Sequence, residues 1–261
     1  MRNARRGARL GQHFLNAEWV ARDLLASLNV AKEETILEIG PGKGALTEKL
    51  LATGRRVVAI EKDEILVARL REKFASEIAA GKLILVENDV RNVEPEKLGL
   101  GAYVLAANIP YYITGEIIRQ FLETAHQPRA AALLIQKEVA ERIVARDGKE
   151  SILSLSVKAY GKPRIIAKVP KGCFNPPPSV DSAILLIDAI SRNFFTGISE
   201  EQFFTVVRAG FSAKRKLLAS NLLKVASHAR TTLAEAGIKE DARAEDVPLE
   251  KWGALARLIA R

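Results

Sequence analysis

The chain has 261 residues, 48% of them hydrophobic, which is enough to bury a large domain and a second, smaller one. Its 40 Lys and Arg against 31 Asp and Glu give a formal charge of +9, and this excess favours a polyanionic partner. A single cysteine, Cys173, excludes an intrachain disulfide, and three scattered histidines offer no metal-ligand spacing, so we expect no metal site. The longest apolar runs are too short for a membrane span, and the arginine-rich start is not followed by a segment of signal-peptide type. We therefore expect a cytoplasmic protein without a membrane partner.

The first part of the chain alternates short apolar strands with helical patterns. Strands are predicted at residues 35–39, 56–60, 83–86, 103–107 and 131–136. This alternation predicts an α/β fold, with a parallel sheet covered by helices on both faces. Two later strands, at 164–169 and 182–190, are separated by a proline-rich loop and would add an antiparallel edge to the sheet.

The pattern changes to helices alone beyond about Arg192. Helices are predicted at residues 200–209, 213–226, 231–236 and 249–260. We therefore divide the chain into a basic arm over residues 1–15, an α/β domain over 16–192 and a small all-helical domain over 193–261.

A glycine-rich turn and two acids point to a nucleoside-containing cofactor. Gly40 and Gly42 lie where the first predicted strand turns into a helix, and glycine there lets a ligand approach the backbone closely. Glu61 ends the next strand, where a carboxylate can accept both ribose hydroxyls, and Asp89 ends the third, where it can meet an adenine amine. Open α/β sheets bind ligands at this edge.

The turn alone leaves the cofactor open between S-adenosylmethionine and a nicotinamide dinucleotide. The spacing of Gly40, Gly42 and Ala45 satisfies the loose dinucleotide pattern. Glu38 lies two residues before the first glycine. Pro41 and Lys43 within the turn make the helix begin later, so no helix N-terminus is evidently aimed at a pyrophosphate. These features favour S-adenosylmethionine.

A second motif, Asn-Ile-Pro-Tyr at residues 108–111, follows the fourth predicted strand. Pro110 biases the residue before it toward an extended backbone, which leaves the carbonyls of the turn available as acceptors. The amide of Asn108 can donate and accept, and Tyr111 or Tyr112 can stack on a base. The turn is suited to holding a flat molecule that bears an amine.

Together these motifs resemble those of the ribosomal RNA adenine N6-dimethyltransferase family. Residues 11–15 (GQHFL) are similar to its N-terminal motif, 38–44 (EIGPGKG) to its cofactor loop, 108–111 (NIPY) to its catalytic motif and 174–182 (FNPPPSVDS) to its late aromatic loop. The resemblance spans essentially the whole chain. His13 differs from the asparagine that the family often has at this position.

The resemblance implies a Rossmann-like class I methyltransferase sheet and S-adenosylmethionine as cofactor. It implies that Asn108 and a carbonyl of the turn accept the hydrogens of the target amine, and that Tyr111 and Phe174 hold an extruded adenine between them. The implied catalytic residues are Asn108, Pro110, Tyr111 and Phe174, and the implied cofactor contacts are Gln12, His13, Leu15, Gly40, Gly42, Glu61, Asp89 and Asn108.

Within the family, residues 211–216 (FSAKRK) and 243–247 (RAEDV) resemble the branch that dimethylates two adjacent adenosines near the 3′ end of small-subunit (16S) rRNA. That branch implies a partner in small-subunit rRNA or a 30S assembly intermediate, and we expect a monomer. The rival branch methylates large-subunit rRNA and confers macrolide resistance. A nicotinamide-dependent oxidoreductase and a non-catalytic RNA-binding assembly factor on the same fold also stay open.

Two runs without acids account for much of the positive charge. The first covers residues 151–172 and includes Lys158; the second runs from Arg208 to Lys224 and includes Lys214, Arg215 and Lys216. Together with the arginine-rich start, they predict phosphate contacts to RNA.

Overall fold

The computed structural model describes residues 13–260, which divide into two compact units. Within these residues, the first unit extends to Ala140 and resumes from Lys162 to Ile190, and the second comprises Glu141–Gly161 and the residues from Ser191 onward. Residues 141–161 thus group with the C-terminal helices, whereas the sequence assigned them to the α/β domain. An ion pair between Lys149 and Asp246 and a 2.8 Å hydrogen bond from Glu150 N to the Glu245 carbonyl tie this segment to the C-terminal part of the chain.

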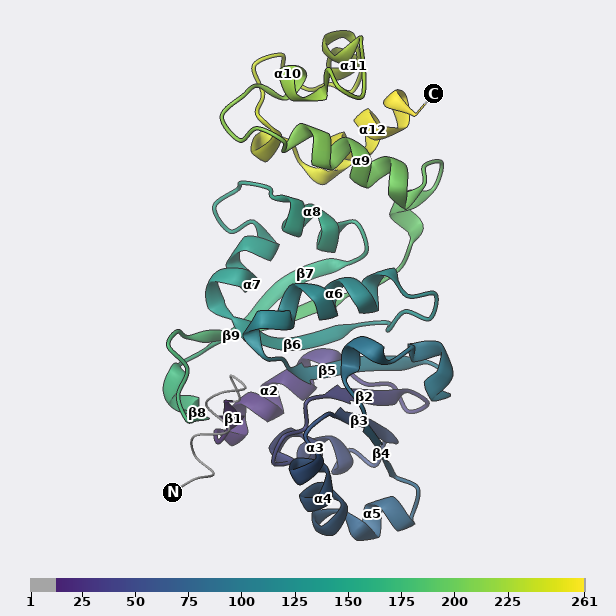
Figure 1. Cartoon of the computed structure of the whole chain (residues 1–261), viewed down its shortest axis with the longest axis vertical. Coiled ribbons are helices and arrows are strands. Elements are labelled where there is room, and N and C mark those ends of the chain that lie inside the picture. The colour runs from purple at the N-terminus through teal and green to yellow at the C-terminus, as the bar shows by residue number, and fades with distance from the viewer. Residues whose placement is uncertain (1–12, 261) are drawn as a thin grey trace. The chain divides into compact units, whose positions relative to one another are not determined.

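The first unit is built on a sheet that, within the described residues, has seven strands in the order β4-β3-β2-β5-β6-β9-β7 (Figure 1). Neighbouring strands from β4 to β6 pair in parallel, as predicted. The strands are β2 (Thr35–Ile39), β3 (Val57–Glu61), β4 (Leu83–Glu87), β5 (Tyr103–Asn108), β6 (Ala131–Gln136), β7 (Lys162–Val169) and β9 (Ser182–Asp188).

The central strands are buried on both faces because helices cover the sheet. On one face, alternate residues such as Ile36 and Ala106 join a core with Leu24 and Leu50 of the covering helices. Asp63 caps one helix as predicted, accepting from the N–H groups of the next turn. The helices of this unit are α2 (Glu18–Leu28), α3 (Ala45–Leu51), α4 (Glu64–Lys73), α5 (Ala75–Ala79), α6 (Thr114–Glu123) and the start of α7 (Lys137–Val144).

The antiparallel part of the sheet lies at the β7 end. Strand β9 inserts between β6 and β7 and runs antiparallel to both. The preceding loop contains Pro176, Pro177 and Pro178, which cannot donate to a ladder, so pairing resumes only at Ser182. The predicted antiparallel edge is therefore confirmed, with β9 as the reversed strand and β7 at the edge.

A second, two-stranded sheet joins segments far apart in the sequence. Strand β1 (Phe14–Leu15) pairs antiparallel with β8 (Phe174–Asn175), with Leu15 opposite Phe174. Both strands are too short to show a periodic pattern, so this pairing could not be predicted. It places the N-terminal motif directly against the late aromatic loop.

The second unit is helical in the part of it that the structure describes. Its core includes the fully buried Phe203 and Trp252, and Phe211 stacks on Trp252 at 5.6 Å between ring centroids. The helix predicted from residue 213 begins only at Leu218, because the Asn221 amide binds the carbonyls of Gly210 and Ala213 and holds the intervening residues in a turn. The helices are α8 (Ile152–Lys158), α9 (Glu200–Gly210), α10 (Leu218–Leu222), α11 (Ala229–Glu235) and α12 (Leu249–Ile259). Among residues 13–260, no helix is long and apolar enough to cross a bilayer.

Candidate active site

A cavity opens in the first unit at the carboxyl ends of β2, β3 and β5. Its volume is about 1080 Å³ including the open mouth. The motifs named from the sequence meet here, as expected at this edge of an open α/β sheet. Predicted site residues that line the cavity are His13, Leu15, Gly40, Gly42, Glu61, Asp89, Asn108, Pro110, Tyr111 and Phe174. The remaining one, Gln12, lies outside the described residues.

The glycine turn forms the floor of one end of the cavity. Gly40 and Gly42 have φ values of 68° and 60°, in the left-handed region that favours glycine. A Cβ on Gly42 would lie 3.1 Å from the Phe14 ring, and one on Gly40 would lie 3.3 Å from the carbonyl oxygen of Asn108. The turn thus brings its own backbone close to both the N-terminal motif and the Asn-Ile-Pro-Tyr turn.

Glu61 at the end of β3 is buried, with 6% of its surface exposed, yet its carboxylate is well satisfied. Oε1 accepts from the N–H groups of Lys62 and Asp63 at 2.9 and 3.0 Å, and Oε2 accepts from Gly42 N–H at 3.1 Å. These three donors hold the side chain against the glycine turn. The lone pairs that remain can accept hydroxyl groups of a ligand.

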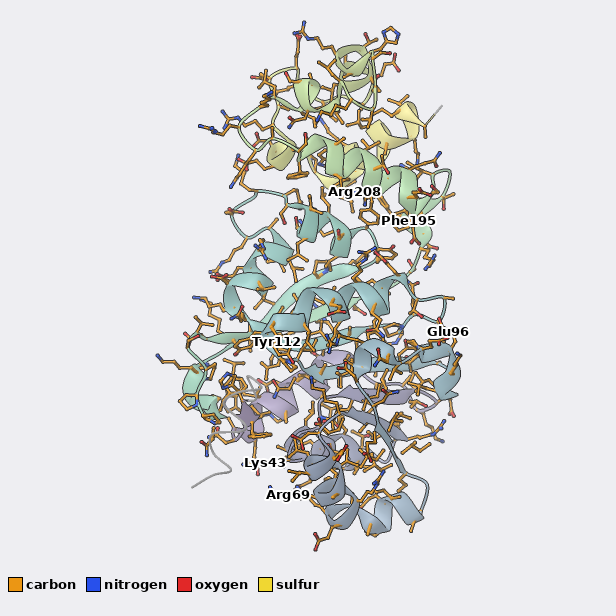
Figure 2. The ribbon with its side chains drawn as sticks, viewed as in Figure 1. Lys43, Arg69, Glu96, Tyr112, Phe195 and Arg208 are labelled. Atoms are coloured by element: carbon orange, nitrogen blue, oxygen red, sulfur yellow. The ribbon has the colours of Figure 1, made fainter. Side chains whose placement is uncertain are left out.

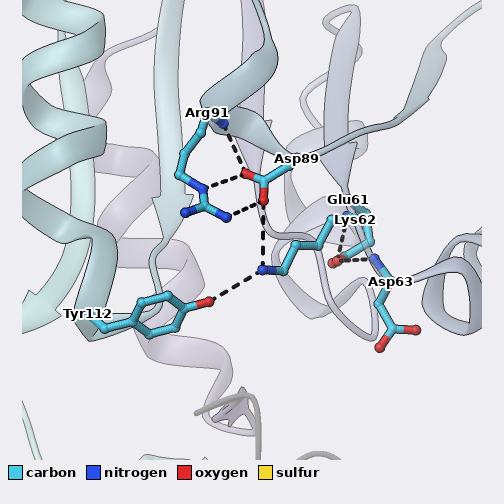
Figure 3. Close-up of polar contacts among 6 residues, drawn as sticks. All are labelled: Glu61, Lys62, Asp63, Asp89, Arg91 and Tyr112. Atoms are coloured by element: carbon cyan, nitrogen blue, oxygen red, sulfur yellow. Dashed lines mark hydrogen bonds and ion pairs between the residues drawn. The ribbon is translucent and has the colours of Figure 1, made fainter.

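Asp89, just after β4, lines the cavity and is paired with cations (Figure 3). Its Oδ1 accepts from Arg91 Nε at 3.0 Å and its Oδ2 from the terminal guanidinium nitrogen at 2.7 Å, and Lys62 Nζ lies 3.9 Å from Oδ2. The hydrogen bond to Arg91 is the main reason that the pKa of Asp89 falls to about 2. Asp89 is therefore ionised at neutral pH, and Arg91 shares the carboxylate that the sequence assigned to a ligand.

Lys62 links this cluster to the Asn-Ile-Pro-Tyr turn. Its Nζ donates to the phenol oxygen of Tyr112 at 3.3 Å, as Figure 3 shows. Tyr112 is 61% exposed. Tyr112 and Lys43 both line the cavity, and both are labelled in Figure 2. Sequence reasoning did not assign a role to Lys62; its position directly after Glu61 was the available signal.

Asn108 at the end of β5 is oriented by the N-terminal motif. Its Nδ2 donates to the backbone carbonyl of His13 at 3.2 Å. This donation uses the nitrogen of the amide and leaves Oδ1 as the acceptor that Asn108 offers to a ligand. His13 is fixed in turn, since its Nδ1 donates to the carbonyl of Pro176 at 2.8 Å.

Tyr111 is half-buried beside Asn108. Its hydroxyl shares a 2.7 Å hydrogen bond with Ser182 Oγ, and its ring stacks on His13 at 5.9 Å and 29°. Burial raises the pKa of the phenol, so Tyr111 stays neutral at physiological pH. The carbonyl of Pro110 accepts from Ile113 N–H at 3.2 Å, which closes the turn behind the tyrosine.

Phe174 lies in β8, the strand that pairs with β1. It lines the cavity but is only 3% exposed and belongs to the hydrophobic core of the first unit. Its role in holding a base stays a prediction, and only the part of the ring that faces the cavity is available for it.

Glu38 is a buried acid beneath the glycine turn for which the sequence suggested no role of its own. Its carboxyl group faces Thr47 on α3, whose hydroxyl and backbone N–H act on it as hydrogen-bond donors. Burial raises the pKa of Glu38 to about 8, although the Thr47 donors lower it, and the negative charge of Glu61 adds to the rise. Glu38 is therefore protonated at neutral pH, in contrast to Glu61 on the adjacent strand.

Solved structures with this fold define the class of protein. The 23S rRNA methyltransferase ErmE matches with a TM-score of 0.78 and 25% identity over 95% of this chain and 100% of that chain. A dimethyladenosine transferase from Plasmodium falciparum matches with a TM-score of 0.81 and 24% identity over 93% and 96%. The sheet order, with its reversed strand beside the edge, is thus that of a Rossmann-like methyltransferase.

The sequence comparisons narrow this class to one family. The family model for ribosomal RNA adenine dimethylases matches residues 3–261. Ribosomal RNA small subunit methyltransferase A of Dehalococcoides mccartyi (strain CBDB1) is 41% identical, over 95% of this chain and 86% of that protein. The protein of the same name from Fusobacterium nucleatum is 36% identical, over 95% and 96%. The chain belongs to the ribosomal RNA adenine dimethylase family, and the resemblance noted in its motifs is confirmed.

Proposed function

We propose that this protein transfers methyl groups from S-adenosylmethionine to N6 of two adjacent adenosines near the 3′ end of small-subunit (16S) rRNA, and so takes part in small-subunit biogenesis. The observation that carries the proposal is the orientation of Asn108, whose amide nitrogen is engaged by the His13 carbonyl while its oxygen is left for a ligand amine. The names of the relatives from Dehalococcoides mccartyi and Fusobacterium nucleatum support the small-subunit substrate.

The residues at the glycine turn fit the proposed cofactor. Gly40 and Gly42 leave the backbone open to close approach, and the buried carboxylate of Glu61 is held in place to accept ribose hydroxyls. Leu15 and His13, which line the cavity, would also contact the cofactor. When bound, S-adenosylmethionine supplies an electrophilic methyl group on a sulfonium.

The target amine needs activation because its lone pair is delocalised into the adenine ring. Asn108 Oδ1 and a carbonyl of the turn would accept its hydrogens and favour the pyramidal nitrogen whose lone pair can attack. These acceptors matter most when positive charge develops on the nitrogen, so they lower the barrier as well as hold the base. A stacked base cannot enter the cavity, and Tyr111 and Phe174 would hold the extruded one.

RNA affinity is proposed to come mainly from the basic run between Arg208 and Lys224 in the second unit. Lys214, Arg215 and Lys216 are all exposed. Lys158 in the other run is instead ion-paired with Glu150, one residue before the stretch that looked free of acids. The proposed substrate places the protein in the cytoplasm, where ribosomes assemble.

The proposal is tested by incubating the protein with labelled S-adenosylmethionine and 30S subunits from a strain without these methylations, beside 50S subunits, and mapping the label. We expect two dimethylated adenosines in 16S rRNA. Label only in 23S rRNA would instead support the activity named for ErmE, and label in neither would overturn the proposal.

The role of Asn108 is tested in the same assay. We expect Asn108→Ala to lose methyl transfer on the order of 10²–10³-fold, because one transition-state acceptor is removed, while cofactor affinity stays nearly unchanged. Asn193→Ala, at an exposed position in the second unit, is the matched control. Wild-type turnover in Asn108→Ala would refute the assigned role.

A further inference from the structure

Ser182 is a buried serine that no motif role accounts for. It is the first residue of β9 and the last of the late aromatic loop, and its surface exposure is 0%. Its Oγ lies 2.7 Å from the phenol oxygen of Tyr111. A buried hydroxyl without a partner is costly, so this hydrogen bond constrains both side chains.

The strand itself does not need this hydroxyl. Ser182 pairs through its backbone with Gln136 on β6 and Val169 on β7, which fixes the start of β9. The side chain is therefore available to act on another element, and the element that it contacts is the Asn-Ile-Pro-Tyr turn, 71 residues earlier.

The ring of Tyr111 is linked to the same loop a second time, through His13. Its face stacks on His13, and His13 donates to the carbonyl of Pro176. Ser182 at the end of the late loop thus holds the hydroxyl of Tyr111. Pro176 near the start of the loop holds His13, whose ring stacks on Tyr111.

These contacts remove the freedom that a stacking tyrosine would otherwise keep. The torsion that sets the plane of an aromatic ring has broad minima, so packing alone leaves the plane loosely defined. The phenol oxygen lies on the axis about which the ring turns, so the hydrogen bond to Ser182 holds the direction of that axis, and the contact with the His13 ring limits the plane. Both are set before a base arrives, so binding of the base does not have to order the ring.

We infer that Ser182 is a positioning residue for methyl transfer: through its hydrogen bond it sets the direction in which the Tyr111 ring points, and with His13 on one face of that ring the target adenine stacks on the other. The inference rests on the proposed function, since it requires a base to enter beside Tyr111. Ser182 itself does not touch the base.

The test is a double-mutant cycle with Ser182→Ala and Tyr111→Phe, which remove the same hydrogen bond from its two sides. Tyr111→Phe keeps the ring, so it separates positioning from stacking. We expect each variant to lower the single-turnover rate on unmethylated 30S subunits about tenfold, as a small misplacement of a reacting group does. The double variant is expected to be no slower than either single one, and all three should bind S-adenosylmethionine with wild-type affinity by calorimetry.

Ser27→Ala is the matched control, because Ser27 bonds only to the Leu24 carbonyl of its own helix in the described structure. It should retain the wild-type rate. Active wild-type protein with unaffected single variants, or with losses that multiply in the double variant, would overturn the inference alone. Wild-type protein that methylates neither subunit would overturn the proposed function, and the inference with it.

Discussion

The two ends of the cavity are built in different ways. At the glycine turn, Glu61 contacts Gly42, 19 residues earlier, and its own two following residues. At the Asn-Ile-Pro-Tyr turn, Asn108 is held by a residue 95 positions away and Tyr111 by one 71 positions away. The end at the glycine turn, which we propose binds the cofactor (the cofactor end), is thus a product of successive strand-turn units. The end at the Asn-Ile-Pro-Tyr turn, which we propose binds the target base (the target end), is assembled from three distant segments.

The largest effect that we expect at the cofactor end concerns Glu38. Its pKa is raised to about 8 in the folded protein from an ordinary value of 4.5, chiefly by burial. The folded state therefore holds this proton more tightly than the unfolded chain, and stability falls as the pH rises from 4.5 to about 8. Over this window the loss from this group is roughly 3–5 kcal/mol.

Glu38→Gln removes this titration and keeps the shape of the side chain. We expect its free energy of unfolding, measured by urea denaturation at several pH values, to lack that part of the decline, so that the variant gains on the wild type as the pH rises. Glu64→Gln, at an exposed position on α4, is the control. Parallel pH profiles for Glu38→Gln and the wild type would show that Glu38 ionises normally.

A smaller effect is expected from Glu61→Gln. A glutamine has a single acceptor oxygen, so its NH₂ group must face at least one of the backbone N–H donors that the carboxylate now satisfies. We expect the dissociation constant for S-adenosylmethionine, measured by calorimetry, to rise about 100-fold, or about 2.7 kcal/mol.

The same variant sharpens the comparison between the two ends. The target end is held by other contacts. The affinity of Glu61→Gln for 30S subunits should therefore stay within about twofold of the wild-type affinity, a change of only about 0.4 kcal/mol. Loss of both affinities together would mean that the two ends are one structural unit.

The smallest effect concerns the basic run of the second unit, which, like the cofactor end, is local in sequence. Replacing Lys214, Arg215 and Lys216 by alanine should weaken RNA binding roughly tenfold and reduce the slope of log affinity against log salt by about 2–3, as three phosphate contacts are lost. Filter binding at several salt concentrations measures both.

A variant with the same change in charge is the control. Arg71, Lys73 and Lys97 of the first unit are each ion-paired with a glutamate. Their replacement by alanine should leave the salt slope close to that of the wild type. Equal slopes for both triple variants would remove the run from the RNA interface.

Most of the fold could be predicted because its strands are short, apolar and separated by clear turn signals. The central strands from Thr35 to Gln136 and the cap at Asp63 follow from local patterns. The late start of α10 does not, because the Asn221 amide competes from within the fold for the carbonyls of Gly210 and Ala213. The grouping of residues 141–161 with the second unit depends on contacts such as that between Lys149 and Asp246, which no local pattern marks.

The site shows the same division. The position of Glu61 at a strand end was readable from the sequence, but the pairing of Asp89 with Arg91 was not. The link from Tyr111 to Ser182 was not readable either, since a serine at the end of a proline-rich loop has no signature of its own. What the sequence leaves out is the set of contacts that orient the proposed catalytic side chains.

The short pairing of β1 with β8 has a consequence for how the protein is made. The strands that carry Gly40, Glu61, Asp89 and Asn108 all leave the ribosome before Phe174 does. A nascent chain can therefore pair its first five parallel strands before Leu15 in β1 can pair with Phe174 in β8. The side of the cavity at β1 and β8 is complete only once Phe174 has been translated, so this wall forms after the parallel strands.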